Sequence, residues 1–369
     1  MYVDILKENL IKGISKTTRL ISSSSQLPIL SNILITAQKN TLILQSTNLE
    51  TSLMITLGAK VEEQGQYTVP ARLFSEFISP LPAEKITLKL EGSKLSISCK
   101  NHQASINGLP PDDFPSFPTH QKKPFLSLDS QTFSNIISSV ALSSTSDDTR
   151  PVLNGVLFDF NGSTLILVAT DGYRLSSHSL SEVKGEFQNM IVPAKSLLEV
   201  QKNISDQQKD QSLEFFQTED KNQIVFQHQD ILLSTRLIDG QFPDYQKIIP
   251  AESTTQIEID TKDLLQAIKL SSVFARENAN IVTFSLKDQL LSISSQSPQL
   301  GENKNDLHVK KQGEDLRIAF NSRYLLELLN CYHEDTLNVE LSGPLAPAVM
   351  KNPNNPSFLH LIMPVRLQS

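Results

Sequence analysis

The chain has 369 residues, a length that favours two or three domains over a single core. Hydrophobic residues make up 39% of it and charged residues 20%, as in globular proteins, and its two cysteines, Cys99 and Cys331, are too widely spaced to indicate a disulfide framework or a clustered zinc site. The net charge of −7 argues against a nucleic-acid partner unless basic residues are gathered locally, because phosphate binding is chiefly electrostatic.

The first third of the chain is predicted to combine two helices with antiparallel strands. Residues 7–22 form an amphipathic pattern, with apolar residues at helical spacing on one side and basic residues nearly opposite: Leu10, Ile14, Thr18 and Ile21 against Lys12, Lys16 and Arg19. A second helix is predicted over 73–79, where Pro80 ends it. Strands are predicted at 32–37, 41–45, 51–57, 86–90, 94–99 and 103–107.

This order of elements recurs twice. Pro70 and Pro193 are 123 positions apart (193 minus 70), Pro193 and Asn321 are 128 apart (321 minus 193), and Phe114 and Phe242 are also 128 apart (242 minus 114). We interpret the period as three copies of one α+β unit, each with two helices packed on antiparallel sheets, rather than two unrelated domains. Proline-rich connectors place the domains at 1–122, 123–250 and 251–369.

In the second copy, residues 164–178 predict a β-hairpin. A β-branched run climbs to Asp171-Gly172, a dipeptide that tolerates positive φ, and alternation resumes after it. Near the C-terminus, residues 361–367 form an apolar run broken by one proline, which predicts a terminal strand. Because chain ends usually fray, this run also indicates an apolar docking surface, with Leu153, Tyr173 and Leu175 as candidates for the opposite wall of a peptide pocket.

Catalytic motifs are scarce. The histidines are scattered, and neither a phosphate-binding glycine loop nor a nucleophile elbow occurs. The acidic pairs Asp112-Asp113 and Asp147-Asp148 lie in polar loops and are interpreted as solvated acids, so we expect no metal and no cofactor. Asp171 is better explained by turn formation than by general-base chemistry. A three-domain hydrolase that uses Asp171 with a carboxylate such as Asp148 remains the alternative.

Basic residues are more informative because they recur at equivalent places in the copies. They start second-type helices or lie along first-type helices, at Lys12, Lys16, Arg19, Arg72, Lys195, Lys262, Lys269 and Arg323. If equivalent helices faced a common interior, an acidic protein would present a positive inner wall to duplex DNA, without reading its sequence. The helix around 130–143 has no Lys or Arg. An acidic scaffold that binds peptides but not DNA is a further alternative.

Five dispersed motifs give the chain a family resemblance. They are Arg150, Leu153-Asn154-Gly155, Thr170-Asp171-Gly172-Tyr173-Arg174, Phe242-Pro243-Asp244-Tyr245 and Met363-Pro364-Val365-Arg366-Leu367. With these motifs the whole chain resembles the bacterial DNA polymerase III beta subunits, the sliding clamps. The resemblance implies half of a closed ring, a head-to-tail homodimer that encircles duplex DNA, tethers the replicative polymerase and has no catalytic site or cofactor.

The resemblance also implies positions for three sites. DNA-facing residues are expected at Lys12, Lys16, Arg19, Arg72, Lys195, Lys262 and Lys269, together with Arg150. The dimer interface is expected at the 103–107 edge of the first domain and at a mating strand in the third, with Gln103, Ile106, Val273 and Phe274. A pocket for short glutamine- and leucine-containing peptides of the polymerase, the clamp loader and repair proteins is expected at Leu153, Thr170, Gly172, Tyr173, Arg174, Leu175, Pro243, Lys247, Ile248, Asn321, Tyr324, Leu345, Met363, Pro364, Val365 and Arg366.

This chain departs from the family at several of these places. Tyr173 stands where histidine is frequent, and Lys247 stands where an arginine is known. Ser24 replaces an arginine, and Pro151-Val152 replaces two tyrosines.

No signal for a membrane or for export is apparent. No apolar run approaches the roughly 18 residues of a membrane span, and Asp4 interrupts the N-terminal segment where a secretory signal would be apolar. We therefore expect a soluble cytoplasmic protein with no membrane partner.

Overall fold

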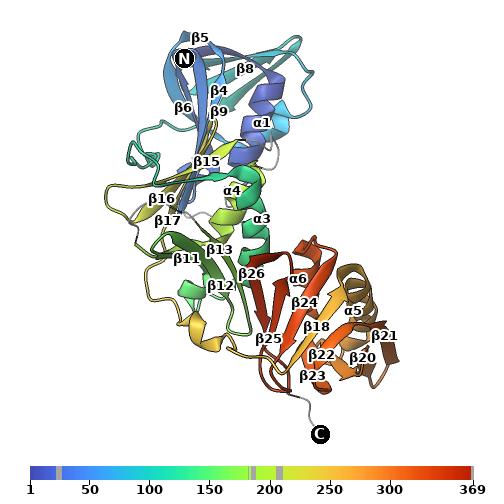
Figure 1. The fold of residues 1–369 in the computed structure, drawn as a ribbon. Helices are drawn as coiled ribbons and strands as arrows, with labels where there is room; N and C mark the ends of the chain where they lie inside the picture. The colour runs from blue at the N-terminus through green and yellow to red at the C-terminus, as the bar shows by residue number, and fades with distance from the viewer. Residues whose placement is uncertain (22–26, 182, 184–187, 205–210, 367–369) are drawn as a thin grey trace. The chain divides into compact units, whose positions relative to one another are not determined.

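The computed structural model describes residues 1–21, 27–181, 183, 188–204 and 211–366 (Figure 1). Ser24 and Leu367 lie outside the described residues. The chain forms two compact units: a first unit of Met1–Phe133 with Glu199–Leu237, and a second unit of Ser134–Leu198 with Ile238–Ser369. The predicted boundaries near 122 and 250 therefore do not coincide with the division by compactness, and they stay predictions.

The first repeat follows the predicted order of elements. Its elements are β1 (Tyr2–Leu6), α1 (Lys7–Thr18), a 3₁₀ turn η1 (Pro28–Ser31), β2 (Asn32–Gln38), β3 (Thr41–Thr47), β4 (Thr51–Gly58), β5 (Lys60–Glu63), β6 (Gly65–Pro70), α2 (Ala71–Ile78), β7 (Lys85–Glu91), β8 (Lys94–Cys99) and β9 (His102–Asn107). All six predicted strands are confirmed. Helix α1 ends four residues before its predicted end, and α2 ends shortly before Pro80, as a proline that lacks the N–H requires.

The second repeat has the same plan. Its elements are β10 (Leu126–Asp129), α3 (Ser130–Val140), η2 (Ala141–Ser143), η3 (Pro151–Asn154), β11 (Gly155–Asn161), β12 (Thr164–Thr170), β13 (Arg174–Leu180), β14 (Met190–Pro193), α4 (Ala194–Ile204), β15 (Ser212–Gln217), β16 (Gln223–His228) and β17 (Ile231–Arg236). Strands β12 and β13 pair antiparallel across Asp171 and Gly172, which confirms the predicted hairpin.

The third repeat completes the threefold order. Its elements are η4 (Tyr245–Ile248), β18 (Thr255–Asp260), α5 (Thr261–Ala275), β19 (Ile281–Lys287), β20 (Leu290–Ser297), β21 (Gly301–His308), β22 (Lys310–Gly313), β23 (Leu316–Asn321), α6 (Ser322–Cys331), β24 (Thr336–Leu341), β25 (Ala348–Asn352) and β26 (Asn355–Ile362). The helix starts predicted at Lys195 and Arg323 are confirmed, because α4 begins at Ala194 and α6 at Ser322. In all three repeats, a helix follows the first strand and a second helix precedes the last three strands.

Two sheets build the first unit. One has five strands in the order β5-β1-β7-β8-β9, and the other has eight in the order β10-β15-β16-β17-β4-β3-β2-β6. The eight-stranded sheet joins strands of two repeats, because β17 pairs antiparallel with β4. Helices α1 and α2 pack on one apolar core with strands of both sheets; Leu10, Ile14, Phe74 and Ile78 are fully buried in it.

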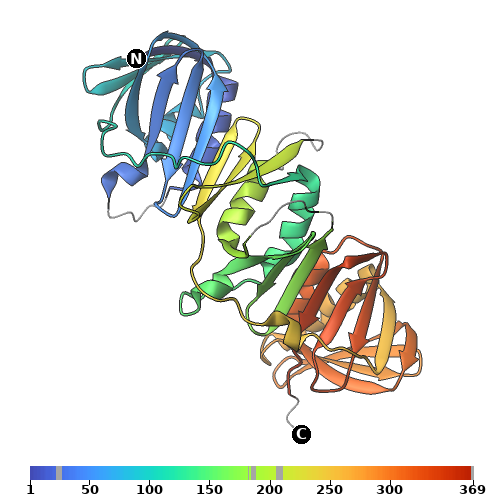
Figure 2. The ribbon, with the colours of Figure 1, turned by 60° about the vertical axis from the view of Figure 1, so that its left-hand side comes forward.

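The second unit is also built from two sheets. Nine strands run in the order β14-β11-β12-β13-β26-β25-β24-β18-β22, and four in the order β21-β20-β19-β23. Figure 2 shows the green strand β13 beside the red strand β26, which pair in the register Arg174 to Ile362. Helices α5 and α6 bury their apolar faces in the core that the two sheets share. This pairing brings the Asp171 turn next to the C-terminal segment.

The predicted terminal strand at 361–367 is wrong over most of its length. Strand β26 ends at Ile362, and Met363–Arg366 have no regular secondary structure. Pro364 lacks the N–H that a paired strand would need. Two backbone hydrogen bonds still hold the segment: Met363 N donates to the Tyr173 carbonyl at 2.8 Å, and Val365 N donates to the Ala319 carbonyl at 2.8 Å.

Candidate functional site

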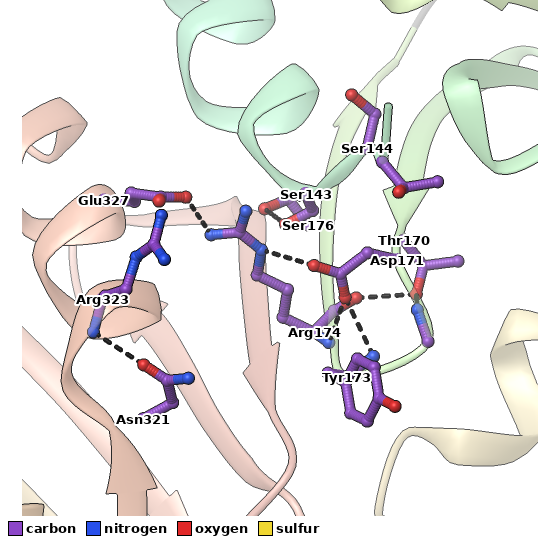
Figure 3. Close-up of polar contacts among 12 residues, drawn as sticks. Ser143, Ser144, Thr170, Asp171, Tyr173, Arg174, Ser176, Asn321, Arg323 and Glu327 are labelled. Atoms are coloured by element: carbon purple, nitrogen blue, oxygen red, sulfur yellow. Dashed lines mark hydrogen bonds and ion pairs between the residues drawn. The ribbon is translucent and has the colours of Figure 1, made fainter. Parts of the chain in front are cut away.

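The turn between β12 and β13 is organised by the Asp171 carboxylate (Figure 3). Its Oδ1 atom accepts hydrogen bonds from the backbone N–H groups of Tyr173 (2.9 Å) and Arg174 (3.0 Å). Gly172 has a φ of +90°, the left-handed region that a residue without a Cβ adopts easily. The remaining oxygen, Oδ2, accepts from Arg174 Nε at 3.0 Å. Asp171 therefore forms the turn, as the sequence indicated, and it also pairs with Arg174, which the sequence did not indicate.

Arg174 is buried behind this turn and joins it to helix α6. Besides its contact with Asp171, its Nη1 atom donates to Glu327 Oε2. Its guanidinium carbon lies 4.5 Å from the centroid of the Tyr324 ring, within the range of a cation–π contact. Only 7% of the side chain is exposed, so these groups replace the water that the charge loses.

A cleft of about 240 Å³ opens beside the turn. Three of its lining residues were predicted for the peptide pocket: Leu153, Tyr173 and Tyr324. Arg150, which was predicted to face DNA, lines the same cleft. Three further lining residues were missed by the sequence reasoning: Thr145, Asp147 and Asp171.

The cleft combines exposed aromatic surface with charge. Tyr173 is 64% exposed, the highest value among the exposed large hydrophobic and aromatic side chains of the described chain. Hydrogen bonds from the backbone N–H and the side chain of Thr149 hold the pKa of the Asp147 carboxyl below its usual range, so it is ionised at neutral pH. With the Arg150 guanidinium beside it, the cleft can accept an apolar side chain and a polar group of a bound chain together.

The other residues predicted for the pocket fall into three groups. Thr170, Arg174 and Leu175 are buried, and the Thr170 hydroxyl donates to the Arg174 carbonyl at 2.6 Å, so they shape the site from behind. Asn321 caps α6, because its side-chain oxygen accepts from Arg323 N at 2.9 Å. The remaining members do not line the cleft, as far as the described residues show: Pro364 and Val365 are half-buried, and the exposed ones are Gly172, Pro243, Lys247, Ile248, Leu345, Met363 and Arg366.

Most of the predicted DNA-facing cations are exposed. Lys12 and Arg19 project from the first helix and its end, Arg72 and Lys195 lie in the first turns of α2 and α4, and Lys262 and Lys269 are on α5. Lys262 forms an exposed ion pair with Asp335, at 3.3 Å. Whether these cations contact DNA stays a prediction.

The predicted outward position of Lys16 is wrong. Its side chain is buried, and Nζ donates to the backbone carbonyl of Asn203 at 3.0 Å. At 100° per residue, Lys16 lies 120° from Leu10 around the helix, on the flank of the apolar face rather than opposite it. An ammonium in this position interacts favourably with the negative, C-terminal end of the α4 helix dipole.

The predicted dimer interface needs two corrections. Gln103 is exposed on β9, an edge strand of the five-stranded sheet, but Ile106 on the same strand is 3% exposed and belongs to the core of the first unit. Val273 and Phe274 lie in helix α5 and not in a strand. Val273 is 49% exposed. The edge strand next to this helix is β21, which ends the four-stranded sheet.

In the part of the chain that the structure describes, no cluster of three or more His, Cys, Asp or Glu side chains is arranged to hold a metal ion. No helix there has the length and apolar character needed to cross a bilayer.

Family models match the chain along nearly its whole length. The N-terminal domain model of the DNA polymerase III beta subunit matches residues 1–118, the central domain model matches 127–244, and the C-terminal domain model matches 246–366. Each match corresponds to one repeat of the element order described above.

Relatives and solved structures agree with these matches. The chain is 31% identical to a beta sliding clamp of Staphylococcus epidermidis and 30% identical to one of Staphylococcus aureus, in each case over 99% of both chains. It is similar to the crystal structure of the DNA polymerase sliding clamp from Bacillus subtilis, with a TM-score of 0.95 and 27% identity over 100% of both chains. It is also similar to a DNA polymerase III subunit beta from Bartonella birtlesii bound to griselimycin, with a TM-score of 0.94, 27% identity and complete coverage of both chains.

Proposed function

The chain belongs to the DNA polymerase III beta subunit family, the sliding clamps, and from this premise we propose how its own residues perform that role. A sliding clamp is a processivity factor without a catalytic site: it encircles duplex DNA and tethers the replicative polymerase. The observation that carries the function is the match of all three family domains, in order, along nearly the whole chain. We propose that two copies close into a ring by head-to-tail pairing.

The hydrolase alternative is not supported. Both carboxylate oxygens of Asp171 are engaged, Oδ1 by two backbone N–H groups and Oδ2 by Arg174. These three hydrogen bonds use the carboxylate to hold the turn and Arg174, a structural role that needs no catalysis. The similarity to sliding clamps likewise gives no support to a scaffold that never meets DNA.

We propose that the exposed cations contact the DNA backbone. Lys12, Arg72, Lys195 and Lys269 are exposed on helices that occupy equivalent places in the repeats. Phosphate contacts made by lysine and arginine are insensitive to base sequence and weaken with salt, which leaves a closed ring free to slide. Encirclement then provides the processivity, so tight binding is unnecessary. The site of action is the bacterial cytoplasm, where the chromosome is replicated.

We propose that the cleft at Tyr173 binds short peptide segments of the polymerase, the clamp loader and repair proteins. An apolar peptide side chain would pack on Tyr173, Tyr324 and Leu153, and Arg150 would pair with a carboxylate or carbonyl of the peptide. Ile248, Leu345 and Met363 are also exposed apolar side chains of the second unit, and we propose them as further contacts for such a segment.

We propose that self-association pairs two edge strands, β9 of one copy and β21 of the other. β9 and β21 each leave one side of their backbone unpaired in the chain described here. Antiparallel addition of one edge to the other satisfies those N–H and C=O groups and removes two exposed edges. The exposed Val273 would add apolar contact beside β21.

Light scattering coupled to size exclusion tests the ring directly. The account predicts twice the 41.1 kDa mass of the chain at micromolar concentration, and a shift towards the monomer for Val273→Asp. A wild-type chain that runs as a monomer under these conditions would refute the proposed pairing. Lys39→Asp, which changes an exposed charge on the first unit outside the proposed interface, is the control and keeps the dimer mass.

A further inference from the structure

Two turns in different repeats share one set of hydrogen bonds. The loop from Thr47 to Thr51 joins β3 to β4, and the loop from Thr170 to Arg174 joins β12 to β13, 123 positions later. In each loop the threonine hydroxyl accepts the N–H two residues on, at 3.1 Å, and donates to the carbonyl four residues on. Asn48 Oδ1 accepts hydrogen bonds from the backbone N–H groups of Glu50 and Thr51. Asp171 Oδ1 accepts the equivalent bonds from Tyr173 and Arg174.

The shared hydrogen bonds form the turn without the two charged side chains of the second repeat. Neutral Asn48 makes the same two hydrogen bonds as Asp171, so the negative charge of Asp171 is not required for the turn. Thr51 stands where Arg174 stands, so a guanidinium is not required either. The charge of Asp171 and the side chain of Arg174 therefore have another purpose in the second repeat.

A glutamate also recurs at one position of the second-type helix. Glu76, Glu199 and Glu327 occupy one position of the second-type helix in the three repeats, 123 and 128 residues apart (199 minus 76, 327 minus 199). Glu199 pairs with Lys202 on its own helix at 2.7 Å, an exposed (i,i+3) contact that contributes little stability. Glu327 instead pairs with Arg174, 153 residues away in sequence.

We propose that Glu327 and the charge of Asp171 are positioning groups that hold the Arg174 guanidinium against Tyr324, and so fix that ring as a wall of the peptide cleft. Tyr324 and Asp171 line the cleft, whereas Glu327 does not, so Glu327 acts through Arg174. Figure 3 shows Arg174 between the turn and α6, with Asp171 on one side and Glu327 on the other. The inference rests on the proposed peptide-binding function.

The physical reason is the shape of the guanidinium. Two fixed partners, at Nε and at Nη1, determine the plane of the group, and the plane determines how it stacks on an aromatic ring. Without Glu327, only the Nε contact to Asp171 remains at one edge. The guanidinium can then rotate away from Tyr324, and the ring loses the cation that lies 4.5 Å from its centroid.

The test is peptide affinity of the full-length chain, measured by fluorescence anisotropy with a fluorescein-labelled glutamine- and leucine-containing peptide. Glu327→Gln is expected to raise Kd about tenfold, which corresponds to about 1.4 kcal/mol, and Glu327→Asp to recover part of the loss. Asp171→Asn keeps the turn in the form that Asn48 shows and is expected to act in the same direction. Glu199→Gln, the matched change in the second repeat, leaves Kd unchanged.

A double-mutant cycle distinguishes positioning from general structural support. If Glu327 acts on the cleft through Tyr324, Glu327→Gln has little further effect in a Tyr324→Leu chain. An equal loss in both backgrounds, or a Kd within twofold of wild type for both Glu327→Gln and Asp171→Asn, overturns the inference. A wild-type chain that fails to bind the peptide at all refutes instead the proposed function on which the inference rests.

Discussion

Lys16 and Asn203 meet through a buried hydrogen bond between an ammonium and the last turn of another helix, with Nζ 3.0 Å from the carbonyl oxygen. Replacing Lys16 with Met keeps the aliphatic stem and removes the donor. We expect Lys16→Met to lower the free energy of unfolding by about 1–3 kcal/mol, because a buried carbonyl loses its charged partner. Chemical denaturation measures the change.

Lys12→Met is the matched control on the same helix. Lys12 is exposed, so its loss should leave the unfolding midpoint within experimental error and weaken DNA retention instead. If Lys16→Met were as stable as Lys12→Met, the buried contact would have no energetic role.

Gly172 and Leu49 occupy the same place in the two matching turns, with φ values of +90° and +76°. A leucine in this region is strained, whereas a glycine is not. We therefore expect Leu49→Gly to stabilise the chain by about 0.5–1 kcal/mol and Gly172→Ala to destabilise it by about 1 kcal/mol. A Cβ at Gly172 would meet nothing closer than 3.7 Å, so the second effect comes from the backbone and not from a clash.

Urea denaturation of both variants checks this pair of predictions. The free energy of unfolding should rise in Leu49→Gly and fall in Gly172→Ala. Shifts of the same sign would show that the two turns are not equivalent in energy.

His360 predicts a loss of stability in acid. Burial lowers the pKa of its imidazole to about 3, and the nearby Arg174 charge acts in the same direction. The unfolded chain, with an ordinary pKa of about 6.5, binds a proton that the folded chain does not bind between pH 6.5 and 3. Stability is therefore complete above pH 6.5 and falls as the pH drops through this window, by about 1.4 kcal/mol at pH 5.5.

Unfolding midpoints at pH 7.5, 6.5 and 5.5 test the prediction. His360→Gln should show a smaller loss between pH 7.5 and 5.5 than the wild type, and His102→Gln, which changes an exposed side chain, should show the same loss as the wild type. An unchanged pH dependence in His360→Gln would exclude His360 as the source.

Tyr173 is the side chain most available to a bound peptide. Removing an exposed aromatic anchor weakens binding but not folding, so Tyr173→Ala should raise the peptide Kd about tenfold with an unchanged unfolding midpoint. Isothermal titration with the peptide measures it. Leu6→Ala, at an exposed apolar residue of the first unit, is the control. A Tyr173→Ala chain that binds the peptide as well as wild type would refute the proposal that the cleft is the peptide site.

Regular elements were predictable because their signals are local. Alternation predicted β2, β3, β4, β7, β8 and β9, and the Asp171-Gly172 dipeptide predicted the hairpin. Periodicity in the landmarks also predicted the threefold order of elements. These signals need no knowledge of which parts of the chain meet.

The errors arise where position depends on distant parts of the chain. Lys16 lies on the flank of the apolar face of its helix. Its burial depends on the contact with the Asn203 carbonyl near the end of α4, which is distant in sequence. Ile106 lies between polar residues along β9, and its side chain points inward because it packs in the core of the first unit. Glu327 had no local signal at all, because its partner Arg174 is 153 residues away.

The central claim is topological linkage to DNA, and retention after loading tests it most directly. The chain is loaded on a nicked circular plasmid by its cognate clamp loader, and the complex is passed through a gel-filtration column before and after a single restriction cut. The account predicts that protein stays with the circle at high salt and is lost once the plasmid is linear. Equal retention on the circle and on the cut plasmid, or equal loss from both, would contradict it.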